Sequence, residues 1–257
     1  MRVLVTFAVE AEFAPWRKLR RFRETLFNEA HYSEGVQVKA AEIGTHEVFV
    51  YLTGIGIKTF DFEAASCFKD GRIDAVISSG LAGALHAECQ PLAVVRPRRV
   101  GTVRDANGIA VAKSLSVTLE GKGAAVIDTL LTSDHIIESH DEKTRLSVFG
   151  QAVDMESFHV VRAFTGEGIP VVVVRAISDG SDEDLPIDFE KCLTSKGKLK
   201  VGALLKDLAK KPSRVPELIR FGRQSRAAAE KLVAFLDSYI GALPPTLMRN
   251  EIEEAFS

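Results

Sequence analysis

The chain has 257 residues, of which 46% are hydrophobic and 26% charged, and its mean hydropathy is +0.06. This composition is typical of a globular protein with a large core, and the net charge of −2 does not indicate a nucleic-acid partner. The apolar run at the start stops at Glu10, too early for a secretory signal, and no stretch reaches the roughly 20 apolar residues of a transmembrane helix. We expect a cytoplasmic protein.

The cysteines and histidines do not indicate a metal site. Cys67, Cys89 and Cys192 lie far apart and outside any CxxC pair, which is typical of reduced thiols. The sequence contains no HExxH motif, so we expect neither a metal nor a cofactor. A serine or cysteine hydrolase is disfavoured because the GxSxG motif is missing and the histidines show no partner spacing.

The first part of the chain predicts strands separated by glycine turns. Apolar and β-branched runs predict strands at residues 3–8, 36–42, 48–52 and 75–79, with a helix at residues 58–69. Two strands end in predicted glycine turns, Thr53-Gly54-Ile55-Gly56 and Gly80-Leu81-Ala82-Gly83. Glycine there lets backbone N–H groups approach a ligand closely. Neither turn fits the dinucleotide-binding or P-loop pattern.

Further along, Asn107-Gly108 predicts a hairpin between strands at residues 102–104 and 109–113. A helix at residues 155–166 and a strongly apolar strand at residues 171–178 follow. Strands that alternate with helices favour an α/β fold. We expect a single domain with a central mixed β-sheet flanked by helices on both faces, in which residues 1–190 form the catalytic part.

Residues 191–257 are expected to form a basic helical extension packed on the same domain. Lysine and arginine greatly outnumber acidic residues between Lys191 and Arg226. Spacings of three, four and seven predict a long amphipathic helix through Leu218, Phe221, Ala228, Leu232, Phe235 and Tyr239. Two interpretations stay open: a helix that covers the sheet with a solvated basic face, or peripheral contact with anionic membrane lipid or a partner at the inner membrane surface.

Three acidic clusters follow strand ends or precede helices. They are Glu10-Ala11-Glu12, Asp154-Met155-Glu156 and Ser178-Asp179. Each could act only as a helix cap or a first-turn acid. Ligands of open α/β sheets, however, bind at the carboxyl ends of the strands. Together the clusters favour a reaction with a cationic transition state and a leaving group that must be protonated, such as glycosidic cleavage.

The order of these motifs resembles the superfamily that contains methylthioadenosine/S-adenosylhomocysteine nucleosidase and the trimeric or hexameric purine nucleoside phosphorylases. The resemblance covers about residues 1–190. Its specific part is Ala152-Val153-Asp154-Met155-Glu156, followed about 20 residues later by Val172-Val173-Val174-Arg175-Ala176-Ile177-Ser178-Asp179. The opening Ala8-Val9-Glu10-Ala11-Glu12 and the two glycine turns support it. The resemblance implies a homo-oligomeric enzyme that cleaves the N-glycosidic bond of a purine nucleoside or 5′-substituted adenosine and releases the free base.

The resemblance also implies roles for individual residues. Asp179 matches the residue that holds or donates a proton at purine N7, and Ser178 orients it. Glu156 matches the glutamate that binds the ribose hydroxyls, Met155 packs under the sugar, and Glu12 activates the attacking water. The remaining expected substrate contacts are Gly54, Gly80, Ala82, Gly83 and Ile136, with Ile137 as the alternative to Ile136 where the family stacks an aromatic ring on the base.

The chain departs from the family pattern at Leu81, where relatives have a small or polar residue, and at Asp154, where the nucleosidases have glutamate. Its basic tail and Leu185-Pro186 are more similar to the hopanoid-associated phosphorylases, which act on adenosylhopane. That similarity favours phosphorolysis with inorganic phosphate as co-substrate, whereas Glu12 favours hydrolysis. Both stay open, as does a nucleoside-binding protein without turnover.

Overall fold

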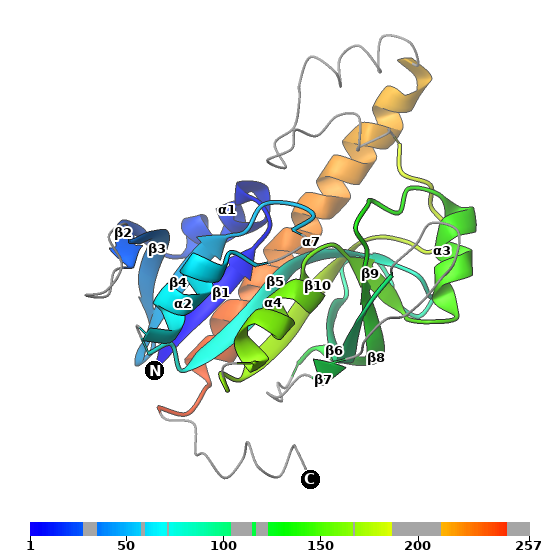
Figure 1. The fold of residues 1–257 in the computed structure, drawn as a ribbon. Helices are drawn as coiled ribbons and strands as arrows, with labels where there is room; N and C mark the ends of the chain where they lie inside the picture. Colours follow the sequence, from blue (N-terminus) through cyan, green and yellow to red (C-terminus); the bar gives the residue numbers. More distant parts are fainter. Residues whose placement is uncertain are drawn as a thin grey trace.

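In the computed structural model, one mixed β-sheet forms the centre of the fold (Figure 1). The structure describes residues 1–27, 35–57, 60–70, 72–103, 115–116, 123–166, 168–186 and 212–245. The strands are β1 (Arg2–Phe7), β2 (Arg23–Phe27), β3 (Val36–Ile43), β4 (His46–Leu52), β5 (Ala75–Ala84), β6 (Val94–Thr102), β7 (Leu115–Ser116), β8 (Ala125–Thr132), β9 (Ala152–Asp154) and β10 (Val171–Asp179). The helices are α1 (Glu10–Leu19), α2 (Phe62–Asp70), α3 (His140–Ser147), α4 (Ser157–Thr165) and α7 (Val215–Gly241), preceded by a 3-10 turn at Pro212–Arg214.

Three largely buried strands lie side by side and run in parallel. β5 pairs with β1 on one side and with β10 on the other, and β1 also pairs in parallel with β4. Antiparallel pairs extend the sheet through β3 and β2, and β5, β10, β6, β8 and β9 pair with one another in a closed ring. Because parallel strands end at the same edge, the segments that follow β1 and β10 meet there.

Helices cover both faces of the sheet, as predicted. On one face, α2 and α4 pack against apolar residues such as Leu4, Val76 and Val173. On the other face, α1 and α7 pack against Val5, Ile77 and other residues of the same strands. Alternate side chains of each strand therefore enter different cores, as the two-residue period of a strand requires. Figure 1 shows α4 in front of β10 and α7 behind the sheet.

The long amphipathic helix predicted near the C-terminus is confirmed as α7, which has 27 residues. Leu232 and Ile240 of its apolar face are fully buried against the sheet. Asp237 on this helix accepts hydrogen bonds from Trp16 Nε1 at 3.1 Å and from Arg20 Nε at 2.9 Å. The helix is thus an integral part of one core. Residues 191–211 of the basic stretch lie outside the described residues, so its contact with lipid stays a prediction.

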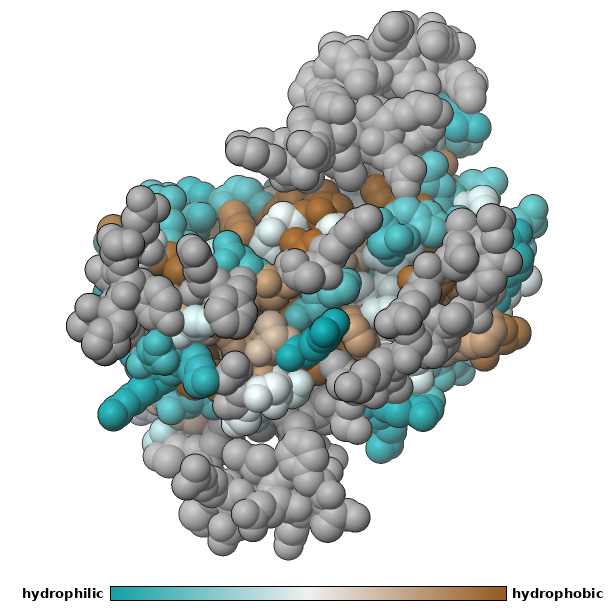
Figure 2. Space-filling view, viewed as in Figure 1, coloured by the Kyte–Doolittle hydropathy of each residue, from teal (hydrophilic) through white to brown (hydrophobic). Residues whose placement is uncertain are grey.

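Exposed apolar side chains are divided between distant parts of the surface. Val148 follows α3, whereas Leu19 and Leu26 belong to α1 and β2, at the opposite end of the molecule in Figure 1. The face drawn in Figure 2 shows small brown apolar areas between teal polar ones. Among the described residues, no helix is long and apolar enough to cross a membrane.

Several predicted boundaries were wrong. The segment Gly80–Gly83 is not a turn, because β5 continues through it and pairs with both β10 and β9. α4 begins at Ser157 instead of residue 155, because Glu156 is its N-cap residue and has non-helical backbone angles; the Asp154 carboxylate accepts a hydrogen bond from the Ser157 N–H. β6 ends at Thr102, and the hairpin predicted at Asn107-Gly108 lies outside the described residues.

Candidate active site

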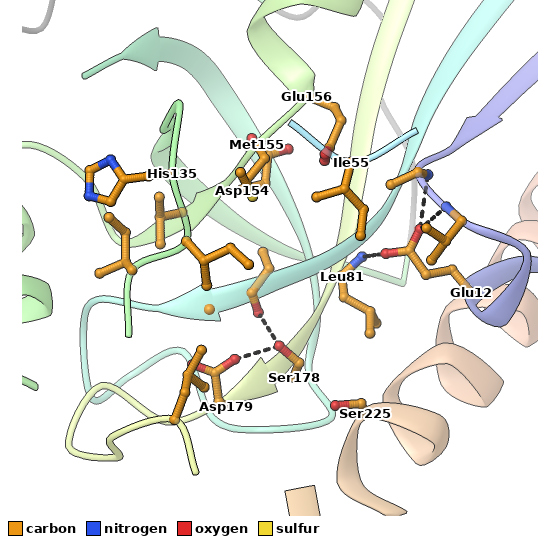
Figure 3. Close-up of a pocket in the computed structure, with 18 of the residues that line it drawn as sticks. Glu12, Ile55, Leu81, His135, Asp154, Met155, Glu156, Ser178, Asp179 and Ser225 are labelled. Atoms are coloured by element: carbon orange, nitrogen blue, oxygen red, sulfur yellow. Dashed lines mark hydrogen bonds between the residues drawn. The ribbon is translucent and has the colours of Figure 1, made fainter. Parts of the chain in front are cut away.

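A cavity of about 260 Å³ opens where β1, β5 and β10 end (Figure 3). Its polar side chains come from segments far apart in the sequence and converge on one space. The walls consist of Ala8, Val9, Glu12, Ile55, Leu81, Ala82, Gly83, His135, Ile136, Ile137, Val153, Asp154, Met155, Glu156, Ser178, Asp179, Leu185, Phe221 and Ser225. Apolar side chains and backbone make up most of this wall, which suits a largely apolar ligand with a few polar groups.

Glu12 is held in the cavity wall by three backbone N–H groups. Its Oε2 accepts hydrogen bonds from Ala8 at 3.0 Å and Val9 at 3.3 Å, and its Oε1 accepts one from Leu81 at 2.9 Å. The bond from Val9 is that of a glutamate in the first helical turn reaching back to the N-cap. Burial raises the pKa of Glu12 and these N–H groups oppose the rise. The carboxylate is therefore fixed in orientation and is a better proton acceptor than an exposed one.

Glu156 lies at the top of the view in Figure 3, with Glu12 at the right and Ser178 and Asp179 at the bottom. Its Oε1 accepts a hydrogen bond from the Gly56 N–H at 2.8 Å. Burial, with the nearby charges of Asp154 and Glu12, raises its pKa to about 8. A protonated Glu156 can both donate and accept hydrogen bonds, which suits binding of a pair of hydroxyl groups.

Asp179 ends β10 and is almost fully buried. Its Oδ1 lies 2.5 Å from Ser178 Oγ, which also lies 3.2 Å from the Ala82 carbonyl oxygen. A Cβ added to Gly83 would lie 3.1 Å from Asp179 Oδ2, so glycine at this position leaves room for the carboxyl group. The carboxyl group of Asp179 is thus held against β5 at the edge of the cavity.

Two buried cations lie behind the carboxyl groups. Lys143 Nζ donates a hydrogen bond to Asp179 Oδ2 at 2.6 Å. Arg175 donates from Nε to Asp154 Oδ2 at 2.8 Å and from Nη2 to Ser78 Oγ at 3.1 Å. Both side chains are fully buried and neither belongs to the cavity wall. Each cation lies where it can balance a carboxyl group that is ionised, and a buried carboxylate without such a partner would be costly to desolvate.

The structure brings together eight of the ten residues that the sequence assigned to the site. These are Glu12, Ala82, Gly83, Ile136, Met155, Glu156, Ser178 and Asp179. The other two glycines are not in the cavity wall. Gly80 lies behind Glu12, where an added Cβ would be 3.2 Å from Oε1, and Gly54 donates its N–H to Ala8 O at 3.0 Å. Both have positive φ, 151° and 85°, so they shape the backbone beside the site.

Sequence reasoning missed the part of the wall that tertiary packing supplies. Phe221 and Ser225 reach the cavity from α7, although the spacing of Phe221 indicated only a core-facing residue. His135 accompanies Ile136 and is bonded through Nε2 to Glu142 at 2.8 Å. Burial lowers the pKa of His135, but hydrogen bonds to its acidic neighbours outweigh this and raise it. No local motif marked any of these three.

The arrangement suits proton-transfer chemistry. The cavity wall contains few positively charged side chains. Glu12, Glu156 and Asp179 bring three carboxyl groups to one cavity, and His135 is the only basic side chain among the described wall residues. Across the described ranges, no three His, Cys, Asp or Glu side chains are grouped to hold a metal ion. A carboxyl pair that activates a nucleophile and protonates a leaving group is the arrangement of acid–base glycosidic cleavage.

Known proteins are similar to this chain in sequence and in fold. Over 202 residues, the chain is 26% identical to the 5′-methylthioadenosine/S-adenosylhomocysteine nucleosidase of Shewanella halifaxensis, covering 68% of this chain and 87% of the relative. A futalosine hydrolase mutant of Helicobacter pylori shares the fold with a TM-score of 0.66 and 16% identity, covering 95% of this chain and 100% of the other.

A second solved structure with the same fold is the 5′-methylthioadenosine/S-adenosylhomocysteine nucleosidase of Helicobacter pylori with butyl-thio-DADMe-Immucillin-A. Its TM-score is 0.65 and its identity 18%, with 95% of this chain and 99% of the other covered. Residues 2–210 match the family model described as the phosphorylase superfamily. This match spans well over half of the 257 residues. The chain belongs to the phosphorylase superfamily.

Proposed function

We propose that this protein cleaves the N-glycosidic bond of a purine nucleoside, with water as the nucleophile. The observation that carries the proposal is the convergence of Glu12, Glu156 and Asp179 on one cavity. Family membership and the nucleosidase names of its relatives support it. The 5′-substituted adenosines that those names mention are the first substrates to test.

In this proposal Asp179 protonates the purine at N7. The C1′–N9 bond then breaks and its electron pair stays on the base, which leaves as a neutral purine instead of an anion. Ser178 orients the Asp179 carboxyl group through Oδ1. A positioned general acid typically contributes about 10²–10⁴-fold in rate.

Glu12 takes a proton from water as the water oxygen attacks C1′. Its raised pKa makes it an effective base, and its three N–H donors fix its direction. Glu156 binds the ribose hydroxyls, and Met155 beside it packs against the sugar. The positive charge that develops on the ribose is stabilised by the Glu12 carboxylate until it takes the proton of the water. After release, Asp179 regains a proton from solvent and Glu12 loses one, so the reaction balances.

The charges around the cavity favour water over phosphate. Lys143 and Arg175 face Asp179 and Asp154, behind the wall, and their donors are engaged there. Within the described wall, a phosphate anion would meet carboxyl groups without a matching arginine or lysine. Phosphorolysis, including that of adenosylhopane, is therefore the alternative outcome of the test and not our proposal.

The test measures base release from methylthioadenosine, adenosine and inosine by chromatography, each with and without inorganic phosphate. Hydrolysis predicts free base and free sugar at a rate that phosphate does not change. Dependence on phosphate, with a sugar phosphate as product, would replace hydrolysis by phosphorolysis. Binding of a nucleoside without any base release would support a nucleoside-binding protein.

The variant that tests the acid is Asp179→Asn, which should abolish base release and spare nucleoside binding. Asp182→Asn is its matched control, because Asp182 is exposed on the loop that follows β10 and is not part of the cavity wall. Full activity in the Asp179→Asn protein would remove Asp179 from the proposed mechanism.

A further inference from the structure

Lys143 is a buried cation. The three N–H donors of its ammonium group all bind to residues at the end of β10 or in the loop that follows it. From α3, its Nζ donates to Asp179 Oδ2 at 2.6 Å, to the Gly180 carbonyl at 2.8 Å and to the Glu183 carbonyl at 2.8 Å. The side chain has no solvent exposure. Burying an ammonium group is costly unless it is paired and hydrogen-bonded. Its position therefore depends on Asp179 at the end of β10 and on the loop that follows it.

We propose that Lys143 is the positioning residue of the general acid: it fixes the Asp179 carboxyl group and stabilises the carboxylate left when the proton moves to the purine. This inference rests on the function proposed above. Before the step, the proton is on Asp179. During the step it moves to N7, the C1′–N9 bond breaks, and negative charge appears on Asp179 beside the ammonium group. A charge-assisted hydrogen bond is about twice as strong as a neutral one, so Lys143 favours proton transfer.

Ser178 allows Asp179 to be held in both protonation states. While Asp179 carries the proton that it directs to N7, the single hydroxyl proton of Ser178 can go to the Ala82 carbonyl. The same proton can instead go to Asp179 once the carboxyl group is ionised. Lys143 can only donate, so its contribution is larger for the ionised state. Ser178 can thus hold Asp179 in either protonation state, whereas Lys143 mainly stabilises the ionised one.

The same ammonium group joins two helices through the loop after β10. Glu183, whose carbonyl it binds, accepts hydrogen bonds through its carboxylate from Arg220 at 2.7 Å and from Gln224 at 3.3 Å. Gln224 also donates to the Ser178 carbonyl at 2.8 Å. Lys143 could therefore be needed only to hold this loop between α3 and α7. A test of the proposal must separate the electrostatic effect from loss of structure.

Substrates with different leaving groups separate the electrostatic effect of Lys143 from a loss of structure. A purine needs protonation to leave, whereas 4-nitrophenolate is a stable anion and leaves a riboside without an acid. We expect Lys143→Met to lower kcat for a purine nucleoside by about 10²-fold, the lower end of the range for a general acid, and to leave kcat for 4-nitrophenyl riboside nearly unchanged. Asp179→Asn should show the same selectivity. The ratio of the two rates within one preparation does not depend on how much of the protein is folded.

Equal slowing of both substrates by Lys143→Met would overturn the proposal and leave a structural role. A second comparison uses the purine nucleoside alone. Lys143→Arg keeps the charge and should retain more kcat than Lys143→Gln, which keeps hydrogen-bond donors without charge. If the glutamine variant matched or exceeded the arginine variant, the charge would be unnecessary and the proposal wrong. Lys231→Met, at an exposed position of α7, is the control for the substitution itself.

These outcomes are distinct from failure of the proposed function. Wild-type protein that released no base from any purine nucleoside would contradict that function before a variant was made. Wild-type protein that released base, combined with equal slowing of both substrates by Lys143→Met, would contradict only the role of Lys143.

Discussion

The backbone N–H of Leu81 donates a hydrogen bond of 2.9 Å to Glu12 Oε1 and so connects the middle of β5 to the first turn of α1. The other carboxylate oxygen is bonded to the N–H groups of Ala8 and Val9, where β1 leads into the helix. Both oxygens of Glu12 thus accept hydrogen bonds from fixed backbone. The candidate base is oriented by the sheet itself, not by a mobile loop.

Glu12→Gln should lower kcat for base release by about 10²–10⁴-fold, because the amide cannot accept the proton of the attacking water. One end of the amide would also place an NH₂ group against a backbone N–H, and a buried donor without an acceptor costs about 1–3 kcal/mol. Base release and thermal unfolding are the measurements. Glu10→Gln is the control, since Glu10 is outside the cavity wall and pairs with Arg17. Unchanged kcat in the Glu12 variant would exclude it as the base.

The pH dependence of the wild-type enzyme should also show that Glu12 acts as a base. Glu12 acts as a base only when ionised, and burial raises its pKa above the ordinary 4.5. Activity should therefore fall as the pH drops through this raised pKa, so that the acidic limb of kcat/KM lies above pH 4.5. A limb at or below that value would contradict the raised pKa.

Gly83→Ala should lower kcat and preserve the fold. Its Cβ would lie 3.1 Å from Asp179 Oδ2, so the carboxyl group must shift by a few tenths of an ångström. A misplacement of about 1 Å costs about 10²-fold in rate, which sets the upper limit here. Gly222→Ala is the matched control. Nothing lies within 4 Å of its added Cβ, and it should stabilise α7 by up to about 1 kcal/mol with kcat unchanged.

The sequence predicted several of the apolar strands and the acids at their ends because both signals are local. The run Val171–Asp179, for example, is buried on both faces, and Asp179 is its last residue. β6 was not predicted, since Pro97 and three arginines interrupt its apolar pattern and only the closed ring of strands gives it a place. The glycines of β5 predict a turn, whereas in the structure their small size serves the close approach of Glu12 and Asp179.

The groups behind the site could not be predicted in the same way. Lys143 precedes Asp179 by 36 residues and reaches it only because α3 packs beside the loop after β10. Phe221 and Ser225 come from α7, whose pattern indicates a buried face but not which cavity that face borders. Contacts of this kind depend on the assembled fold, whereas an acid at a strand end is visible in a single motif.

Leu232→Ala should destabilise the whole protein by about 2–5 kcal/mol, because it removes a fully buried side chain from the core shared by α7 and the sheet. The neighbouring Lys231→Ala, at an exposed position, should change stability by no more than about 0.5 kcal/mol. Urea unfolding of the two variants measures both values. A cost below 1 kcal/mol for Leu232→Ala would mean that α7 is a dispensable addition to the domain.

Glu156→Gln should stabilise the protein at alkaline pH while impairing catalysis. Burial and nearby carboxylates raise the pKa of Glu156 from an ordinary 4.5 to about 8 in the folded state. Between these values the folded protein binds more protons at this group than the unfolded chain, so its stability falls as the pH rises. Glutamine does not ionise and can still accept the hydrogen bond from Gly56.

The Tm of Glu156→Gln relative to wild type should therefore rise from pH 4.5 to about 8 and then level off, with the variant the more stable protein above pH 8. Thermal unfolding of both proteins across this range is the measurement, and Glu217→Gln, exposed on α7, is the control. A Tm difference that did not change with pH would show that Glu156 is already ionised in the folded protein. In that case it would meet the ribose as a fixed negative charge instead of as a hydrogen-bond donor.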